Sequence, residues 1–367
     1  MLFVAHVGRF GGSAVSLRIL LRHLGGRFRV VLAGPVDEPV ARDLVDAHLV
    51  ADVVPLSLER RRRRATVVGP LRVAVWAASN RRRIRAIHAN GLVDLALATP
   101  AASLLRLPVV VWVHDAGVGD RRVRMLRGVF RWLVPRITWV GVSHAAAASL
   151  EQFGYVTSSA VEVVPNPIEA EQVIPLARID EGSEVRVGFL GTDTTRKGFD
   201  TLPEIVRMLD GPPVRLLVFA RHHLGLPDEV ERAWDALEAD SRSGTVEIGG
   251  HQVDVRAAYA RCDIVLCPSR QESFCRVVAE AMLNGIPVVA SSIPAIEELV
   301  GGEAGILVPP GDAREAARAI ERLAADPALR HRLGEVGRRR ASAFAPDLVA
   351  DRFAALYEGA GAPRRRV

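Results

Sequence analysis

Short apolar segments alternate with longer amphipathic segments through the first half of the chain. The apolar segments are mostly rich in β-branched residues and predict buried strands at residues 2–7, 29–34, 84–89, 109–114 and 137–143. The segments between them place apolar residues at helical spacing and predict helices at residues 14–24, 92–105 and 120–133. Alternating strands and helices predict a parallel sheet that helices cover on both faces.

The same alternation begins again after residues 165–183, a segment with three prolines that is typical of an interdomain linker. Strands are predicted at residues 184–190, 214–220, 246–249, 264–268 and 287–291, and helices at 199–209, 228–239, 253–260, 277–284 and, in the tail, 312–325, 327–344 and 346–359. We therefore predict an α/β chain with two doubly wound, Rossmann-like domains, residues 1–164 and 184–345, that face a central cleft. The last residues, 346–367, form a helix that can cross back to the first domain.

The composition narrows the class of protein. The 367 residues suffice for two domains, and a hydrophobic fraction of 49% gives each a core. Three cysteines fit a reducing compartment, and no Cys–His spacing indicates zinc. No apolar run approaches the roughly 20 residues of a membrane-spanning helix. Because the N-terminal residues are typical of a first strand rather than a signal peptide, we expect a cytoplasmic protein.

Lysine is almost absent from the chain. Lysine and arginine total 48, and Lys197 is the single lysine among them, which leaves 47 arginines. Lysine carries a compact charge on a flexible stem, whereas the arginine head group is a planar fork. A position that stays lysine in this background is therefore a candidate site for a compact positive charge. The alternative is a surface lysine that survives by chance.

The segment from residue 267 to 291, CPSRQESFCRVVAEAMLNGIPVVAS, combines two glutamates with a strand-to-helix transition. A helix that starts near Phe274 or Cys275 would leave the amides of Phe274, Cys275 and Arg276 free to bind an anionic phosphate. Glu272 precedes this anion site and could accept hydrogen bonds from sugar hydroxyls, and Glu280 could hold a ribose. The alternative is that Glu272 is an ordinary helix cap and Glu280 a solvated residue, although a charge within the run VVAEAML needs a partner.

This segment resembles the signature PS-x-x-E-x-F-G-R-V-x-x-E-A-M-A-x-G-x-P-V-V-A of the family-four glycosyltransferases, which have the GT-B fold. Seven residues separate Glu272 from Glu280, as in that family. The resemblance implies that Glu272 contacts the donor sugar, that Glu280 contacts the nucleotide ribose, and that the helix amides hold the donor phosphates. Cys275 stands where glycine is usual.

The segment GTDTTRKGFDTL resembles the family pattern G-R-L-x-x-x-K-G-x-D-x-L. The resemblance implies that Lys197 pairs with the donor diphosphate through a charge-assisted contact. The upstream arginine of the family is replaced by Thr192. Arg196 is the candidate to take over its role.

Two further sites follow strands of the first domain. HVGRFGGS resembles the glycine-rich loop of the family, which lies against the donor phosphates, so Gly12 and Ser13 are candidates for donor binding. A plain strand-to-helix turn is the alternative. His114 stands at a strand end where the family commonly has a histidine that faces the donor sugar. His88 and His144 also follow strands and are weaker candidates.

The resemblance implies an enzyme that moves a hexose-type sugar from a nucleotide-diphosphate sugar to a glycan, lipid-linked or small-molecule acceptor with retention of anomeric configuration. No metal or other cofactor is expected, and the leaving phosphate would act as the base in a front-face attack. The alternatives are a nucleotide-sugar 2-epimerase on the same fold and an inactive binding subunit.

Arginine runs at residues 60–64, 81–83 and 364–366 indicate a further partner. They are either a solvated surface or a peripheral contact with an anionic membrane, where each basic residue contributes about 1 kcal/mol. We expect no nucleic acid, because aromatic residues make up only 5% of the chain and do not alternate with the arginines.

Overall fold

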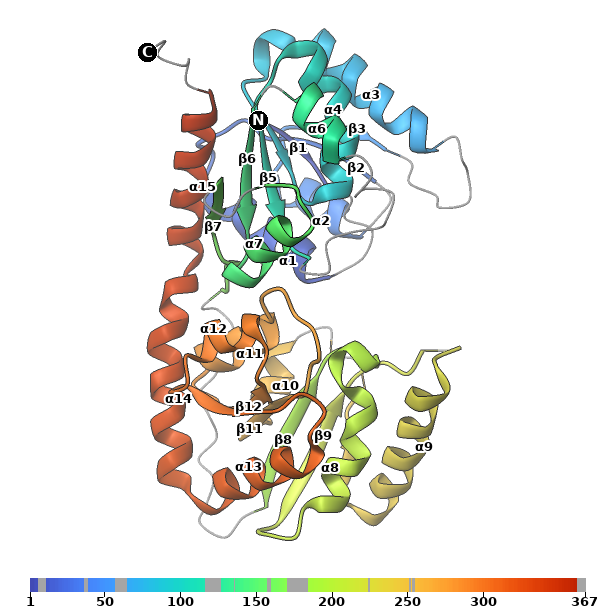
Figure 1. Ribbon diagram of the computed structural model, residues 1–367, viewed down its shortest axis with the longest axis vertical. Helices are drawn as coiled ribbons and strands as arrows, with labels where there is room; N and C mark the ends of the chain where they lie inside the picture. Colours follow the sequence, from blue (N-terminus) through green and yellow to red (C-terminus); the bar gives the residue numbers. More distant parts are fainter. Residues whose placement is uncertain are drawn as a thin grey trace. The chain divides into compact units, whose positions relative to one another are not determined.

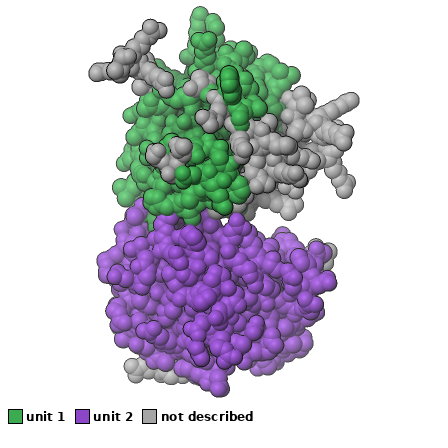
Figure 2. All heavy atoms as spheres, viewed as in Figure 1, with its two compact units in different colours: residues 1–167, 344–367 green, residues 168–343 purple. Residues whose placement is uncertain are grey.

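The chain forms two compact units, residues Met1–Pro167 with Phe344–Val367 and residues Ile168–Ala343 (Figure 2). The computed structural model describes residues 1–5, 11–35, 39–56, 65–115, 127–134, 136–156, 160–169, 184–223, 225–250, 252 and 255–361. Each unit is built on one parallel sheet with helices packed on it (Figure 1). The two-domain α/β fold that the alternating pattern predicts is therefore confirmed.

The sheet of the first unit has the strand order β3-β2-β1-β4-β5-β6-β7. Its strands are β1 (Leu2–Val4), β2 (Val31–Gly34), β3 (Asp52–Pro55), β4 (Ile87–Ala89), β5 (Val109–Val113), β6 (Ile137–Gly141) and β7 (Val161–Val163). Its helices are α1 (Gly12–His23), α2 (Pro39–Asp46), α3 (Ala65–Ser79), the 3-10 turn η1 (Arg81–Arg83), α4 (Leu92–Leu105), α6 (Arg127–Leu133), α7 (His144–Gln152) and α15 (Pro346–Gly361).

Side chains of β1 pack on both faces of this sheet. Leu2 and Val4 belong to the core that α3 and α4 cover, whereas the ring of Phe3 lies 5.8 Å from that of Tyr357 on α15. Successive side chains of a strand point to opposite faces, so α15 covers the face away from α3 and α4. The C-terminal helix thus belongs to the first unit, although residues Ile168–Ala343 of the second unit precede it in sequence.

The sheet of the second unit has the order β10-β9-β8-β11-β12-β13. Its strands are β8 (Val185–Leu190), β9 (Val214–Phe219), β10 (Val246–Ile248), β11 (Ile264–Cys267), β12 (Val288–Ser291) and β13 (Gly305–Val308). Its helices are the 3-10 turns η4 (Thr195–Lys197) and η5 (Phe199–Thr201), then α8 (Leu202–Met208), α9 (Asp228–Ser243), α10 (Val255–Tyr259), α11 (Arg276–Leu283), α12 (Pro294–Val300), α13 (Ala313–Ala325) and α14 (Pro327–Ala341); η6 (Ser342–Phe344) follows at the boundary of the units.

The predicted strands all occur in the described residues, but the ends differ. β1 ends at Val4 rather than at residue 7, and the helix predicted at 199–209 begins as the 3-10 turn η5 before α8. Residues 120–126 of a predicted helix lie outside the described residues. The pattern missed the edge strands β3, β7 and β13, each of which lies in a short apolar run.

In each sheet the order reverses beside the first strand of the unit. β8 lies between β9 and β11, and β1 lies between β2 and β4. Ligands of open parallel sheets bind beyond the carboxyl ends of the strands at such a reversal. The loops that follow β8 and β11 are therefore the first place to look for a site in the second unit.

Candidate functional site

Lys197 and Glu272 meet beyond the carboxyl ends of β8 and β11. The two strands pair directly, with Val187 opposite Ile264, so the loops that follow them leave the sheet side by side. Lys197 ends the turn η4 after β8, and Glu272 lies in the loop after β11. The Lys197 Nζ is 2.5 Å from the Glu272 Oε1. Pairing of β8 with β11 thus brings together two charges that the sequence separates.

This ion pair is largely buried. The Lys197 side chain is 20% exposed and that of Glu272 is 7% exposed. The hydroxyl of Ser269 donates a second hydrogen bond to Glu272 Oε1, at 2.9 Å. Burial acts to lower the pKa of Lys197, but the nearby Glu272 carboxylate outweighs it and the pKa lies above its ordinary value. Lys197 is therefore protonated at neutral pH.

Gly198 allows the two loops to approach so closely. Its φ is +71°, in the left-handed region that favours glycine, and a Cβ at this position would lie 2.1 Å from the carbonyl oxygen of Pro268. The glycine after the lysine is thus required by the contact between η4 and the end of β11.

Helix α11 begins at Arg276, one residue before the predicted range 277–284 and one or two residues after the start near Phe274 or Cys275 that the anion site assumed. Cys275 is the N-cap, and the Cys275 carbonyl accepts from Ala279. The backbone amides of residues 275–278 therefore lie at the N-terminal end of the helix, in its first turn. Of the predicted amide set, Arg276 starts the helix, Cys275 is its cap and Phe274 precedes the cap, and their role in anion binding stays a prediction. The site still offers amides and a helix dipole to an anion.

Cys275 has a left-handed backbone, with φ 66°. A residue with a Cβ pays about 1–2 kcal/mol for this conformation, and glycine pays almost none. This is the physical reason why glycine is favoured at the cap of this helix and why cysteine is unusual there. The side chain of Cys275 turns into the protein and is buried.

Glu280 is buried, and each of its carboxylate oxygens accepts a hydrogen bond within the second unit. Arg276 Nη2 donates to its Oε1, and the hydroxyl of Tyr259 donates to its Oε2, both at 2.9 Å. Burial, followed by the Glu280 charge, holds the pKa of Tyr259 well above its ordinary value, so the phenol keeps its proton. Glu280 is therefore not a solvated helix residue, and Arg276 positions its carboxylate from one turn earlier.

The candidates around Lys197 are more exposed. Arg196 Nη1 donates to the carbonyl of Gln271 at 3.1 Å and lies 3.8 Å from Glu272 Oε2, and its side chain is 52% exposed. Thr192, which replaces the arginine of the family pattern, is also exposed. Arg196 thus places a second cation at the rim of the Lys197–Glu272 pair.

Sequence reasoning missed Asp193, whose side chain is almost fully buried after β8. It accepts hydrogen bonds from the backbone amide of His223 and from the indole of Trp234, at 3.1 and 3.2 Å, and its Oδ1 lies 2.7 Å from His223 Nδ1. These contacts fix the loop after β9 against the loop after β8. An aspartate in a loop gives no periodic signal; only its place directly after a strand could have marked it.

In the first unit, the candidates follow β1 and β5. Gly12 starts α1 and is exposed, and Ser13 is half-buried. His114 follows β5, its Nε2 is 3.1 Å from Asn90 Oδ1, and its ring lies 4.3 Å from that of Trp112. Gly12 and His114 thus follow strands on either side of β4. His88 is wholly buried on β4, so it is a structural residue of the first unit.

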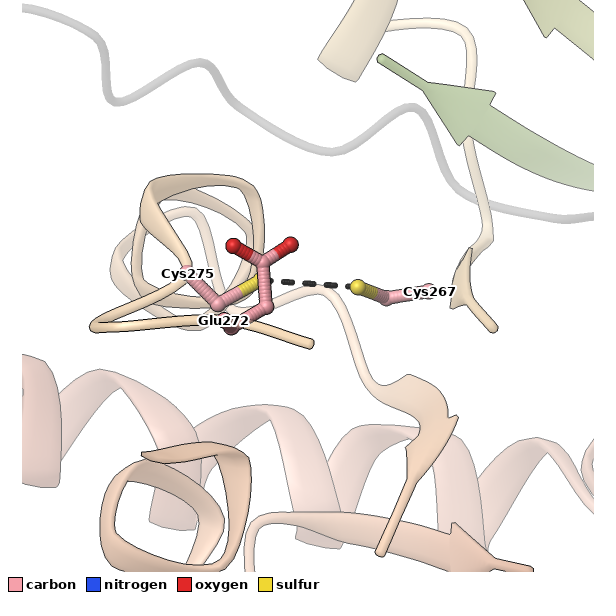
Figure 3. Close-up of side chains that lie close together, drawn as sticks. All are labelled: Cys267, Glu272 and Cys275. Carbon is pink, nitrogen blue, oxygen red and sulfur yellow. Dashed lines mark hydrogen bonds between the residues drawn. The ribbon is translucent and has the colours of Figure 1, made fainter. Parts of the chain in front are cut away.

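Figure 3 shows a compact group formed by Cys267, Glu272 and Cys275. One sulfur or oxygen atom from each residue lies within 4.8 Å of the others, which is close enough for three metal ligands. The Glu272 carboxylate is already paired with Lys197, however. A cation at this place would have to share the carboxylate with that ammonium.

None of the helices in the described residues is long and apolar enough to cross a membrane.

Comparisons with known proteins identify both halves of the chain. Residues 10–172 match the family model Glycosyltransferase Family 4, and residues 184–326 match the model Glycosyl transferases group 1. The two matched regions together include every candidate residue in both units. The comparisons therefore reach the same family as the resemblance in the segment that holds Glu272 and Glu280.

Individual relatives support the same assignment. The phosphatidyl-myo-inositol mannosyltransferase of Mycobacterium tuberculosis is 31% identical over 289 residues, which cover 72% of each chain. The lipopolysaccharide core biosynthesis glycosyltransferase LpsE of Rhizobium meliloti is 30% identical over 201 residues, which are 53% of this chain and 57% of that protein. The crystal structure of Anabaena HepE in complex with UDP and glucose has a TM-score of 0.80 at 21% identity and covers 97% of this chain and 98% of its own.

Proposed function

Because the chain belongs to the family 4, group 1 glycosyltransferases and has their GT-B fold, we propose that it transfers a hexose-type sugar from a nucleotide-diphosphate sugar with retention of anomeric configuration. The observation that carries the proposal is the buried Lys197–Glu272 pair close to the first turn of α11. A diphosphate needs positive charge and amide donors, and a sugar needs a hydrogen-bond acceptor beside them. This part of the second unit supplies all three.

The donor diphosphate would bind between Lys197 and the amides of Arg276, Val277 and Val278. Negative charge grows on the diphosphate as the bond to the sugar breaks, and fixed positive charges stabilise that state more than the ground state. Lys197 remains charged at neutral pH, as its raised pKa requires. Arg196, at the rim, adds a second cation to the same group.

Glu272 and Glu280 would bind the two sugars of the donor. Glu272 Oε1 accepts from Lys197 and Ser269, whereas Oε2 lies 3.8 Å from Arg196 and would accept a hydrogen bond from a sugar hydroxyl. Each oxygen of Glu280 accepts one bond and retains capacity for a ribose hydroxyl. A metal ion has no part in this scheme.

We propose that the acceptor is a glycan or a lipid-linked molecule that is reached at an anionic membrane surface. The names of two relatives refer to phosphatidyl-myo-inositol and to the lipopolysaccharide core. In the first unit, neighbouring helices expose large apolar side chains, with Trp132 on α6 exposed to 90% and Leu104 on α4 to 67%. The three arginines of η1 are exposed directly after α3. Apolar anchors with nearby cations are typical of interfacial binding.

Vesicle binding tests the membrane proposal. In a flotation assay, the protein should rise with vesicles that contain anionic phosphatidylglycerol. With vesicles of phosphatidylcholine alone, it should stay unbound at the bottom of the gradient. Trp132→Ser with Leu104→Ser should weaken flotation, and so should high salt. Equal recovery with both kinds of vesicle would contradict a charge-assisted contact.

A donor screen tests the transferase proposal. UDP, GDP, ADP and TDP sugars are added one at a time, and the correct donor should raise the apparent melting temperature, because a ligand of the folded state stabilises it. Lys197→Ala and Glu272→Ala should each lower sugar transfer by orders of magnitude. Arg318→Ala is the matched control, because Arg318 forms an exposed pair on α13.

The nature of the product distinguishes the alternatives. Proton NMR of the glycoside should show the anomeric configuration of the donor. An epimerised sugar after incubation with donor alone would indicate an epimerase, and donor binding without turnover would indicate an inactive binding subunit. Full transfer by purified Lys197→Ala would remove the assignment of the diphosphate site.

A further inference from the structure

Cys267 and Cys275 face each other in the interior of the second unit. Cys267 is the last residue of β11 and follows Leu266, whose side chain belongs to a hydrophobic core on one face of the sheet. Because successive side chains of a strand point to opposite faces, the side chain of Cys267 lies on the other face. Cys275 caps α11, which packs on β11. The two Sγ atoms are 3.4 Å apart and point at one another (Figure 3). Their residues are 5% and 4% exposed.

We propose that Cys267 and Cys275 are an oxidation site, at which a peroxide joins the two sulfurs in an intrachain disulfide that weakens donor binding. The disulfide itself stands on the position of the two sulfurs. The effect on donor binding rests on the proposed function. Neither the family comparisons nor the resemblance assigns a role to this pair, since glycine is usual where Cys275 stands.

The reaction needs only a peroxide as oxidant. The Cys267 thiolate attacks one oxygen of hydrogen peroxide, which gives a sulfenic acid and releases hydroxide. The Cys275 sulfur then attacks the sulfenic sulfur, the S–O bond breaks, and the departing hydroxide and the first hydroxide take up the two thiol protons. Two thiols and one hydrogen peroxide thus yield one disulfide and two water molecules.

The surroundings favour Cys267 as the attacking sulfur. The hydrogen bond from Cys275 lowers the pKa of the Cys267 thiol, burial opposes this, and the net pKa is below its ordinary value. The Glu272 charge also opposes the lowering, whereas the hydrogen bond with Ser269 and the positive charge of Lys197 support it. The hydrogen bond between the two cysteines raises the pKa of Cys275, which therefore keeps its proton and acts as the resolving thiol. The pair thus places the sulfur with the lowered pKa in contact with a neighbouring thiol, at 3.4 Å.

Bond formation would move the start of α11. A disulfide has an S–S distance of about 2.05 Å, so the two sulfurs must approach by more than 1 Å. Cys275 is the N-cap of the helix and is held in a left-handed backbone with φ 66°. The amides of Arg276 and Val277 follow it directly. A shift of the cap therefore changes the position of the amides that the proposed function gives to the donor phosphates.

Cys262 provides an internal control. It lies in the same unit and is equally buried, but its Sγ donates to the carbonyl of Ala258 at 3.1 Å. Burial is the main cause that raises the pKa of this thiol to about 12. Cys262 is therefore a thiol rather than a thiolate at neutral pH and should resist the same peroxide treatment.

The test treats the full chain with hydrogen peroxide and measures its intact mass. The expected result is the loss of two hydrogen atoms, a cross-linked peptide that contains Cys267 and Cys275, and recovery of the original mass after dithiothreitol. Cys262→Ser should behave as the wild type does. Cys267→Ala and Cys267→Ser should both fail to lose the two hydrogens, and a second substitution guards against one that does not fold.

The donor-binding part has a separate readout. Affinity for the nucleoside diphosphate found in the donor screen is measured for reduced, oxidised and re-reduced protein, and oxidation should lower it about tenfold or more and reversibly. Intact mass without the two-hydrogen loss, or a disulfide that includes Cys262, would overturn the oxidation site. A disulfide without change in affinity would overturn the effect on binding. If reduced protein binds no nucleotide at all, the proposed function fails while the mass result stands.

Zinc distinguishes oxidation from metal binding. Cys267, Glu272 and Cys275 could also act as ligands, so the reduced protein is incubated with zinc chloride and its metal content is measured after gel filtration. We expect no retained zinc, because Lys197 already neutralises Glu272. Retention of one zinc ion per chain that also blocks the peroxide reaction would identify a metal site instead and overturn the proposal.

Discussion

The Lys197 ammonium and the Glu272 carboxylate meet at 2.5 Å across 75 residues of sequence. Neither charge could be buried alone without a large desolvation cost. Burial of the Lys197 ammonium therefore depends on the Glu272 carboxylate, and burial of the carboxylate depends on the ammonium. In the proposed function, a donor that binds here would find both groups already oriented. The pair links the loop after β8 to the loop after β11, so it contributes to the stability of the second unit.

A double-mutant cycle should show this mutual dependence. Lys197→Ala leaves the Glu272 carboxylate buried with Ser269 as its remaining close donor, and we expect the free energy of unfolding to fall by about 1–3 kcal/mol. Adding Glu272→Gln should restore part of that loss, because the unpaired charge is gone. Urea unfolding of the four proteins measures the coupling. Strictly additive effects would show that the two groups do not interact in solution.

Gly198→Ala should disrupt the site sterically. The new Cβ would lie 2.1 Å from the carbonyl oxygen of Pro268, and the residue would also keep a φ of +71°. Gly244→Ala is the matched control: Gly244 has a φ of +90°, but no atom of the described residues lies within 4 Å of the place that its Cβ would take. We expect a loss of about 1 kcal/mol in the control and a loss of several times that in Gly198→Ala. Thermal unfolding measures both.

The same two variants distinguish, in the nucleotide-binding assay, the effect of backbone strain at a left-handed residue from the effect of the clash with Pro268. Nucleotide affinity should fall in Gly198→Ala, because Lys197 is displaced with the turn, and should be unchanged in Gly244→Ala. If both variants lose equal stability and affinity, the close approach of η4 to Pro268 is not what positions Lys197.

Tyr259→Phe should loosen the Glu280 carboxylate. The hydroxyl donates to Glu280 Oε2 at 2.9 Å, and its loss leaves a buried carboxylate with one donor fewer. We expect about 1–3 kcal/mol less stability and a several-fold rise in the dissociation constant of the nucleotide, measured by calorimetry. Tyr259 would act as a positioning residue for Glu280.

Tyr357→Phe is the control for this variant. Tyr357 also buries its hydroxyl, 2.9 Å from His88 Nδ1, but in the first unit. It should lose comparable stability without a change in nucleotide affinity. An unchanged dissociation constant in Tyr259→Phe would contradict the role of Glu280 in donor binding.

His88 should make the first unit sensitive to acid. Complete burial lowers its pKa from 6.5 to about 3, so the folded chain keeps the imidazole neutral where the unfolded chain takes up a proton. The contribution to stability is therefore present above pH 6.5 and is lost as the pH falls toward 3. The slope from this one group is at most about 1.4 kcal/mol per pH unit.

A comparison of two histidine variants with the wild type shows whether His88 causes the pH dependence of the melting temperature. The melting temperature of His88→Leu should fall less steeply than that of the wild type between pH 6.5 and pH 4.5, because one proton uptake on unfolding is missing. His331→Leu, at an exposed position of α14, should keep the wild-type slope. Parallel curves for His88→Leu and wild type would exclude a neutral buried imidazole.

The sequence predicted much of the site through residue types and local order. Lys197, Glu272 and Glu280 were found because one is a single lysine and the others keep a fixed spacing before a strand-to-helix transition. The start of α11 was misplaced by about a residue, because the cap depends on the backbone of Cys275 rather than on a residue preference. The local sequence pattern predicts that a helix or strand occurs in a segment. It does not predict the exact residue at which the backbone hydrogen bonds begin or end.

The partners of these residues could not be predicted. Tyr259 precedes Glu280 by 21 residues, and Asp193 precedes Trp234 by 41, so nothing in the local pattern connects them. Cys267 and Cys275 are close in sequence, yet their contact depends on the alternation of β11 and on a left-handed cap.

By itself, the sequence determined the alternation of strands and helices, the two α/β domains and the residues that are candidates to hold a sugar diphosphate. These properties follow from periodicity and side-chain chemistry, which are local. Only the tertiary structure decided that Lys197 neutralises Glu272 and that the hydroxyl of Tyr259 donates to Glu280. Those contacts depend on which strands become neighbours, and strand order is fixed by the packing of the whole unit.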